Sequence, residues 1–99
     1  MTSYYVILWN FTEQGVKSLK NSLQSIGVFI AYIDRQYGAG AHRGSFYSFG
    51  SYDAISLVEA DDDNYIRYSL SIAEKDGNIR STTLKSITLE EAMKFAETI

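Results

Sequence analysis

The segment YYVILWNF, residues 4–11, constrains the fold of this chain most, because a strand built from it is apolar on both faces. One face carries Tyr5, Ile7, Trp9 and Phe11, and the other carries Tyr4, Val6, Leu8 and Asn10. A strand with one solvated face alternates apolar and polar side chains, and this segment does not. The pattern therefore predicts a sheet that is covered on both sides.

The segment after this strand has the period of a helix. Thr12 is the expected N-cap and Gly38 the expected stop signal. Apolar residues recur between them at steps of three and four, at Val16, Leu19, Leu23, Ile26, Ile30, Ile33 and Tyr37. We expect a kink or a break at Gly27, because a continuous helix of this length would be long for a small domain.

The second half of the chain alternates strand and helix patterns. The predicted elements are strands at residues 42–49, 53–60 and 78–87 and a helix at residues 62–75. Gly50-Ser51 is the expected turn between the first two of these strands, and Asp61 the expected N-cap of the helix. The helix residues expected to face the core are Ile66, Leu70 and Ala73.

A capping box at Thr88-x-x-Glu91 predicts one more helix at the C-terminal end. The residues expected to face inward from it are Leu89, Ala92, Met93 and Ala96.

This order of elements is β-α-β-β-α-β plus a C-terminal helix, in a single domain spanning residues 1–99. It predicts an α+β, ferredoxin-like fold, with a four-stranded antiparallel sheet and both crossover helices on one face. The other face would then be bare, and a bare apolar face of this size usually marks an interface. We therefore predict that the sheet packs on a second copy, giving a homodimer or higher oligomer that resembles a dimeric α/β barrel.

Composition excludes several classes of function. The net charge is −3 and there is no dense basic run, so no nucleic-acid partner is predicted. The absence of cysteine excludes disulfides, thiolate nucleophiles and cysteine-based zinc sites, and favours a cytoplasmic location. No apolar run reaches the ~20 residues of a membrane span, and the N-terminal segment lacks the basic region of a signal peptide.

The motif Gly50-Ser51-Tyr52-Asp53 is the first candidate for a functional site. In one interpretation Gly50 supplies a positive φ, Asp53 accepts N–H bonds within its own turn, and Tyr52 packs. In the other, Gly50, Tyr52 and Asp53 bind a ligand, or Asp53 acts as an acid or base with the Tyr52 hydroxyl as donor. The structural interpretation is favoured, because Gly/Asp turns are common.

His42, Arg43 and Arg80 are further candidates. His42 is the only histidine, and as a general base it would need an orienting partner such as Asp53. Arg80 and Arg43 present guanidinium forks that suit an anionic ligand or Asp53. The run 61–63, three aspartates, is interpreted as helix capping, because it lacks the spacing of a calcium loop. No metal site and no cofactor are predicted.

Three blocks of the sequence resemble the GYD-domain family. They are residues 10–22 (NFTEQGVKSLKNS), 46–63 (FYSFGSYDAISLVEADDD) and 77–88 (GNIRSTTLKSIT). The family comprises small bacterial and archaeal proteins with a ferredoxin-like fold and no assigned function. The resemblance therefore implies the same fold and an unassigned function for this chain. Residues 23–44 depart from the family pattern, because the helix there is apolar and aromatic rather than charged and alanine-rich.

A looser similarity runs to the dimeric α/β-barrel group. That group includes cofactor-free monooxygenases and the ligand-sensing domains of Lrp/AsnC-type regulators. The latter carry a similar Gly-x-x-Asp hairpin near a small-molecule site between subunits, and Gly50 and Asp53 would match it. This similarity concerns the fold, and fold does not determine function.

Two hypotheses of function follow. In the first, the protein is a non-catalytic oligomeric module that binds a small molecule or regulates through it, using Gly50, Tyr52, Asp53 and Arg80. In the second, it is a cofactor-free small-molecule enzyme, similar to a monooxygenase or an isomerase, that uses His42 with Asp53 and Tyr52. The first is preferred, because the sequence offers few catalytic groups. The identity of a ligand and the number of subunits are left open.

Overall fold

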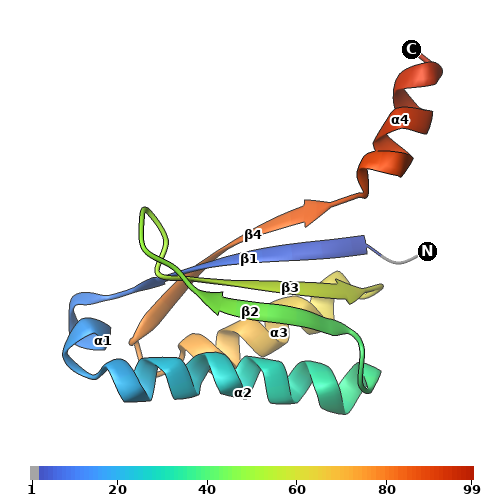
Figure 1. The fold of residues 1–99 in the computed structure, drawn as a ribbon. Helices are drawn as coiled ribbons and strands as arrows, with labels where there is room; N and C mark the ends of the chain where they lie inside the picture. Colours follow the sequence, from blue (N-terminus) through green and yellow to red (C-terminus); the bar gives the residue numbers. More distant parts are fainter. Residues whose placement is uncertain (1–2) are drawn as a thin grey trace.

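Four antiparallel strands form one sheet in the order β2-β3-β1-β4 in the computed structural model, which describes residues 3–99 (Figure 1). The strands are β1 (Ser3–Phe11), β2 (His42–Tyr47), β3 (Ala54–Ala60) and β4 (Ile79–Ser86). β1 is central and pairs with both β3 and β4. Because two helices cover one face of this sheet, the predicted α+β, ferredoxin-like architecture is confirmed.

The helices are α1 (Glu13–Lys17), α2 (Leu19–Tyr37), α3 (Asp63–Glu74) and α4 (Leu89–Glu97). The predicted break in the first helix exists, but it lies at Ser18 and not at Gly27. The reason is a close approach at Gly15, where an added Cβ would lie 1.9 Å from the carbonyl oxygen of Asn78. Contact with the segment before β4 fixes α1 separately from α2, whereas Gly27 lies inside α2 beside open space.

The buried stripe of α2 differs from the predicted one. Val16, Leu19 and Leu23 are exposed, so their expected place in the core is wrong. The buried residues of α2 are Ser22, Ser25, Ile26, Phe29 and Ile33. Ser22 is buried because its hydroxyl donates to the Gly15 carbonyl oxygen at 2.9 Å, which turns this part of α2 toward α1.

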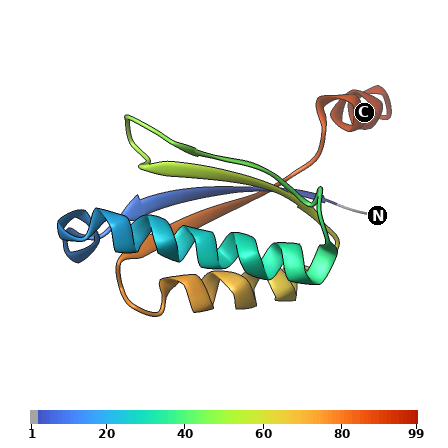
Figure 2. The same cartoon turned by 60° about the horizontal axis from the view of Figure 1, so that its bottom comes forward.

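The core lies between the sheet and the layer formed by α2 and α3 (Figure 2). From β1, Tyr5, Ile7 and Trp9 point into it, and the Trp9 ring meets Phe29 edge-on at 5.4 Å between centroids. The predicted core residues Ile66, Leu70 and Ala73 of α3 are buried in the same layer. Among the described residues 3–99, helices cover one face of the sheet and leave the other exposed.

Most of the predicted signals at the ends of elements are confirmed. Thr12 and Thr88 cap α1 and α4 through side-chain bonds to backbone N–H groups, and Gly38 ends α2 with φ of 80°. The N-cap of α3 is Asp62 rather than Asp61, and its carboxylate accepts from the N–H groups of the next turn. β2 and β3 are shorter than predicted, because residues 48–53 form the connection between them.

The predicted packing of α4 is wrong. α4 has no buried residue, and both views show it beyond the end of β4, on the side of the sheet away from α2 and α3 (Figures 1 and 2). The radius of gyration, 14.5 Å, exceeds the ~13 Å typical of a compact domain of this length. The apolar side chains of α4 therefore have no partner surface within residues 3–99. No helix in this range is long and apolar enough to cross a membrane.

Candidate functional site

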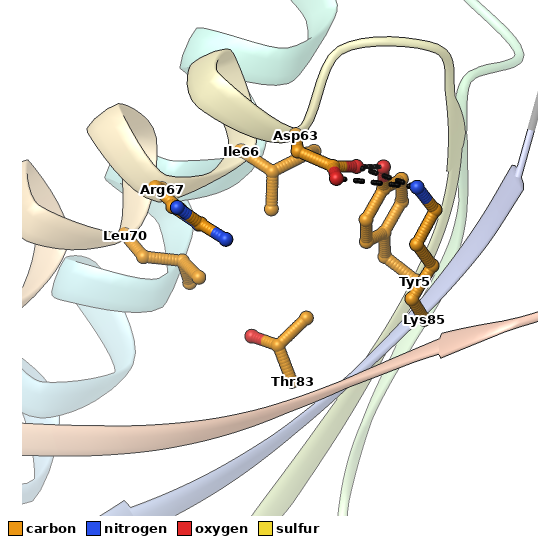
Figure 3. A pocket seen from close by; sticks show the side chains of 7 residues that line it. All are labelled: Tyr5, Asp63, Ile66, Arg67, Leu70, Thr83 and Lys85. Atoms are coloured by element: carbon orange, nitrogen blue, oxygen red, sulfur yellow. Dashed lines mark hydrogen bonds and ion pairs between the residues drawn. The ribbon is translucent and has the colours of Figure 1, made fainter.

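A cavity of about 340 Å³ lies between α3 and β4, on the helix side of the sheet (Figure 3). Its lining residues are Tyr5, Asp63, Ile66, Arg67, Leu70, Thr83 and Lys85. β4 is an edge strand, and its exposed middle makes few contacts with α3, so the space between them is unfilled. The walls of the cavity come from β1, α3 and β4, and β1 is far from the other two elements in the sequence.

At one end of the cavity, Tyr5, Asp63 and Lys85 form a cluster (Figure 3). The Tyr5 hydroxyl donates to Asp63 Oδ1, and Lys85 Nζ lies 3.1 Å from the same oxygen and 3.2 Å from Oδ2. Tyr5 comes from the central strand, Asp63 from the first turn of α3 and Lys85 from the edge strand. The cluster therefore joins the helix layer to two strands of the sheet.

The electrostatics of this cluster keep its two acidic groups in fixed protonation states near neutral pH. Burial, followed by the hydrogen bond to Asp63, raises the pKa of Tyr5 to about 12. The hydrogen bond from Tyr5, followed by that from Lys85, holds the pKa of the Asp63 carboxyl below its ordinary value. Tyr5 is thus a neutral donor and Asp63 an anion across the physiological range.

The middle of the cavity combines one cation with apolar walls. Arg67 extends from α3 into the space between α3 and β4, and Ile66 and Leu70 lie on the same helix (Figure 3). Thr83 presents its hydroxyl from β4 on the opposite side. Unlike Lys85, Arg67 joins no ion pair among residues 3–99. The cavity therefore offers the Arg67 guanidinium, the Thr83 hydroxyl and an apolar wall to a small molecule, beside the ion pair of Asp63 with Lys85.

Sequence reasoning did not find this cavity. In the sequence Asp63 belongs to a predicted capping run, and Tyr5 and Lys85 lie within predicted strands. Their meeting depends on how α3 lies against the sheet, which no local pattern reports. The sequence pattern that bears on this cavity is the pair Thr83 and Lys85, which lie two positions apart in the predicted strand 78–87 and therefore on the same face.

The predicted residues Gly50, Tyr52 and Asp53 lie together in the connection between β2 and β3, at residues 48–53. Asp53 has a structural contact that the prediction did not specify. Its Oδ2 accepts from the backbone N–H of Phe11 at 2.8 Å, and its own N–H donates to the Trp9 carbonyl oxygen at 2.8 Å. The carboxylate thus binds the end of β1 rather than its own turn.

His42 lies at the other end of β3 from Asp53. His42 pairs with Val58, which is five residues after Asp53, so ~17 Å of strand separates their positions. Within one chain, the structure therefore does not bring His42 together with Asp53 and Tyr52.

The imidazole of His42 takes part in a chain of hydrogen bonds inside the sheet. Its Nε2 lies 2.7 Å from Ser45 Oγ, which lies 2.7 Å from Ser56 Oγ. Ser56 Oγ accepts from the Trp9 indole N–H at 2.9 Å. This chain gives His42 a structural role in tying β2 to β3 and β1.

Arg80 is exposed on β4 opposite Asn10, on the face of the sheet away from the helices. It lies at the same end of the sheet as Asp53, but on the other side of β1, about two strand spacings or ~10 Å away. Arg43 pairs with Glu59 at the opposite end. In the part of the chain that the structure describes, no three His, Asp or Glu side chains gather into a group that could hold a metal ion.

The uncovered face of the sheet is the second feature of interest. Alternation and strand register assign to it Tyr4, Val6, Leu8 and Asn10 of β1, Phe46 of β2, Ile55, Leu57 and Glu59 of β3, and Thr82 and Leu84 of β4. Its centre is apolar and partly exposed, and its charged groups lie toward the ends. We call this surface the open face.

Two solved structures are among those similar to this chain. A hypothetical protein of Pyrococcus horikoshii, PHS023, has 18% identity, with 89% of this chain and 92% of that chain aligned and a TM-score of 0.45. FFRP-DM1 has 16% identity, with 88% and 100% aligned and a TM-score of 0.43. No curated protein sequence matches this chain. The family model for the GYD domain matches residues 5–96, and the chain therefore belongs to the GYD-domain family.

Proposed function

We propose that this chain is a non-catalytic, self-associating module that binds a small organic anion in the cavity between α3 and β4. The observation that carries the proposal is the lining of the cavity, where Arg67 and Thr83 face each other beside the apolar Ile66 and Leu70. Small-molecule sites typically have volumes of ~300–1,000 Å³, mostly apolar walls and a few convergent polar groups. The cavity, at about 340 Å³, lies at the lower end of that range.

The charge of the preferred ligand follows from Arg67. The Lys85 ammonium is neutralised by Asp63 at 3.1 Å, whereas Arg67 joins no ion pair among residues 3–99. A guanidinium presents a planar fork of N–H donors that matches the two oxygens of a carboxylate. A carboxylate with an apolar body would bind Arg67 with one end and contact Ile66 and Leu70 with the other.

Binding is favoured over catalysis because of the protonation states in the cavity. A general acid or base works best when its pKa lies near the working pH. The pKa of Tyr5 is raised to about 12 and that of Asp63 is lowered, so both move away from neutrality. Both groups therefore suit the positioning of a ligand better than proton transfer.

The alternative hypothesis, a cofactor-free enzyme using His42 with Asp53 and Tyr52, has less support. It requires a base within hydrogen-bond reach of its orienting partner. His42 and Asp53 belong to opposite ends of β3, and each has a structural partner, Ser45 and the Phe11 N–H.

Self-association through the open face is supported by its apolar centre. The four strands are ~4.8 Å apart and about seven residues long, which makes the face roughly 20 Å square. A face of this size lies in the range of a few hundred Å² in which exposed apolar patches often have a function. Light scattering at micromolar concentration tests this part, and a monomer there would contradict it.

Ligand binding is tested by titrating the protein with benzoate, a carboxylate with an apolar body, followed by NMR shifts. Benzyl alcohol, which has a similar shape without the charge, and inorganic phosphate, which has charge without an apolar body, are the comparison probes. We expect benzoate to shift residues around the cavity, and to bind at least tenfold more weakly to Arg67→Gln. Arg80→Gln is the matched control, because Arg80 is exposed on the open face.

Three results would contradict the binding proposal. They are equal binding of benzoate and benzyl alcohol, equal loss of binding in the two arginine variants, and shifts confined to residues 48–53. Native mass spectrometry of the purified protein adds an independent measurement. We expect a retained small acid in the unmodified chain that is absent from Arg67→Gln.

A further inference from the structure

Helix α4 has an apolar surface that no other part of residues 3–99 covers. The exposed fractions of Leu89, Met93, Phe95 and Ile99 are 86%, 64%, 65% and 90%. Isolated helices shorter than ~12–15 residues are marginal in water, and α4 has 9 residues. The N-cap at Thr88 stabilises the first turn of α4 and not the rest of the helix. A stable α4 therefore requires a surface to pack against.

The position of α4 restricts where this surface can be. Only Ile87 and Thr88 separate α4 from β4, and α4 lies on the same side of the sheet as the open face (Figures 1 and 2). If two open faces pack together, their sheets lie ~10 Å apart. A helix of 9 residues is ~14 Å long, so α4 would extend past the edge of the facing sheet toward that copy's helix layer.

The four corners of the sheet differ in chemistry, and only one suits an apolar helix. Charged groups occupy the corner where β2 begins, with Arg43, Glu59 and Asp61 around a shallow hollow. Polar groups occupy the corner where β4 begins, near Asp76, Asn78 and Arg80. The corner where β4 ends is the one from which α4 itself extends. At the corner where β2 ends, the exposed aromatic residues are Phe46, Tyr47 and Phe49.

This last corner also contains a groove between α2 and β2, of about 230 Å³. Its lining residues are Leu23, Ile26, Gly27, Ile30, Ser45, Phe46, Tyr47 and Ala54. Gly27 lies beside open space in this groove, because a Cβ built there has no neighbour within 4 Å. The groove opens at the edge of the sheet, where an α4 extending from a facing sheet would pass.

A two-fold axis can bring these two features together. The start of β2 and the start of β4 are diagonally opposite corners of the sheet. We place the axis midway between the two facing sheets and parallel to the diagonal that joins these two corners. Rotation by half a turn about this axis then superposes the other two corners, the end of β2 in one copy and the end of β4 in the other. The end of β4 in one copy then lies over the end of β2 in its partner, and the strands of the two sheets cross at nearly right angles. Orthogonal packing of this kind is one of the two common arrangements of facing sheets.

We infer that α4 of each copy packs into the groove between α2 and β2 of a second copy. The inference rests on the proposed self-association through the open face and adds the contact that completes it. Two faces roughly 20 Å square bury about 400 Å² of flat area per copy, about half of the ~800 Å² per partner of a standard interface. α4 and the groove supply further area, and the contact explains why the apolar residues of both are exposed in a single chain.

Cross-linking between two single-cysteine variants tests the inference, and the absence of natural cysteine makes the result specific. One variant is Gly27→Cys in the groove, and the other is Met93→Cys on α4. We expect a short bis-maleimide to join them into a mixed dimer when they are combined. Ser71→Cys on the exposed side of α3, combined with Met93→Cys, is the control that should give at least tenfold less product.

A second variant tests the same contact without a linker. Gly27→Phe fills the groove, and the open space around Gly27 lets the chain fold. We expect α4 to be displaced, so trypsin should cleave after Lys94 several-fold faster than in the unmodified chain.

The outcomes separate this inference from the proposed function. A monomer by light scattering would overturn self-association and the inference together. A dimer without the mixed cross-link, or with unchanged cleavage after Lys94 in Gly27→Phe, would overturn only the placement of α4. A chain carrying both Gly27→Cys and Met93→Cys that cross-links within one molecule would show that α4 folds back on its own groove. Benzoate binding in the cavity between α3 and β4 is independent of all these results.

Discussion

The two faces of β1 have nearly the same apolar character but different environments. Tyr5, Ile7 and Trp9 are buried under α2 and α3, whereas Tyr4, Val6 and Leu8 lie on the open face and are partly exposed. The first face contributes to the stability of the single chain. The second contributes little until another surface covers it. An apolar pattern in a strand therefore indicates that its side chains are to be buried. It does not indicate whether the same chain or another molecule buries them.

The largest expected difference between the two faces is in the free energy of unfolding when one side chain on each face is shortened. Trp9→Ala removes the edge-on contact with Phe29 and leaves a buried cavity, so we expect a loss of ~3–5 kcal/mol in the free energy of unfolding. Leu84→Ala on the open face should cost less than ~1 kcal/mol in the single chain, because its side chain is exposed. Urea unfolding followed by circular dichroism measures both. Equal losses would mean that the faces do not differ as described.

A second prediction concerns the attachment at the end of β1. Asp53→Ala leaves the Phe11 N–H without its acceptor, and we expect a loss of ~1–3 kcal/mol in the free energy of unfolding. Asp53→Asn keeps an acceptor oxygen at the same place and should cost less. If both variants unfold like the unmodified chain while ligand binding is lost, the carboxylate acts on a ligand rather than on the strand.

A charge on the open face is expected to affect self-association much more than the stability of the single chain. Leu8→Lys should change the free energy of unfolding of the single chain by no more than ~0.5 kcal/mol, because Leu8 is not in the buried core. It should nevertheless abolish self-association. The unfolding temperature of the unmodified chain should rise with protein concentration, and that of Leu8→Lys should not. Concentration dependence that persists in Leu8→Lys would exclude the open face as the interface.

The smallest expected effect is a change in pH dependence at Tyr5. Its pKa rises to about 12 in the folded chain from an ordinary value of 10.0, so its contribution to stability is present below pH 10 and is lost as pH rises toward 12. Tyr5→Phe should therefore show a shallower fall in unfolding temperature over that interval.

The acidic side of the same hydrogen bond has the opposite sign. The pKa of Asp63 is lowered, so its contribution is present above the ordinary value of 3.8 and is lost as pH falls below it. Asp63→Asn should show less acid destabilisation than the unmodified chain. The unfolding temperature of both variants can be measured by thermal melts from about pH 2 to about pH 12, in steps of about one unit.

Local signals in the sequence were sufficient for most of the fold. Thr12, Thr88 and Gly38 act through bonds or backbone angles within a few residues of themselves, so they could be recognised without the tertiary structure. The break in the first helix could not be placed in this way. It depends on Gly15 meeting Asn78, a contact between segments more than sixty residues apart.

The candidate site was less accessible to sequence reasoning. The motif at Gly50-Ser51-Tyr52-Asp53 was visible because its residues are adjacent, but the partner of Asp53 is the Phe11 N–H, 42 residues away. Tyr5, Asp63 and Lys85 come from three elements, and each is ordinary in its own segment. Their joint effect on one another's protonation arises only from proximity in space.

The amino-acid sequence alone is enough to predict the order of strands and helices, the ends of most elements and the apolar character of both faces of β1. These properties depend on residue type and on spacing along the chain, which are fully present in the sequence. The folded structure is needed to show which face of β1 is buried, which residues line the cavity between α3 and β4, and that α4 lies apart from the core. Those outcomes depend on the direction in which each helix leaves its neighbouring strand. A few distant contacts, such as that of Gly15 with Asn78, set that direction.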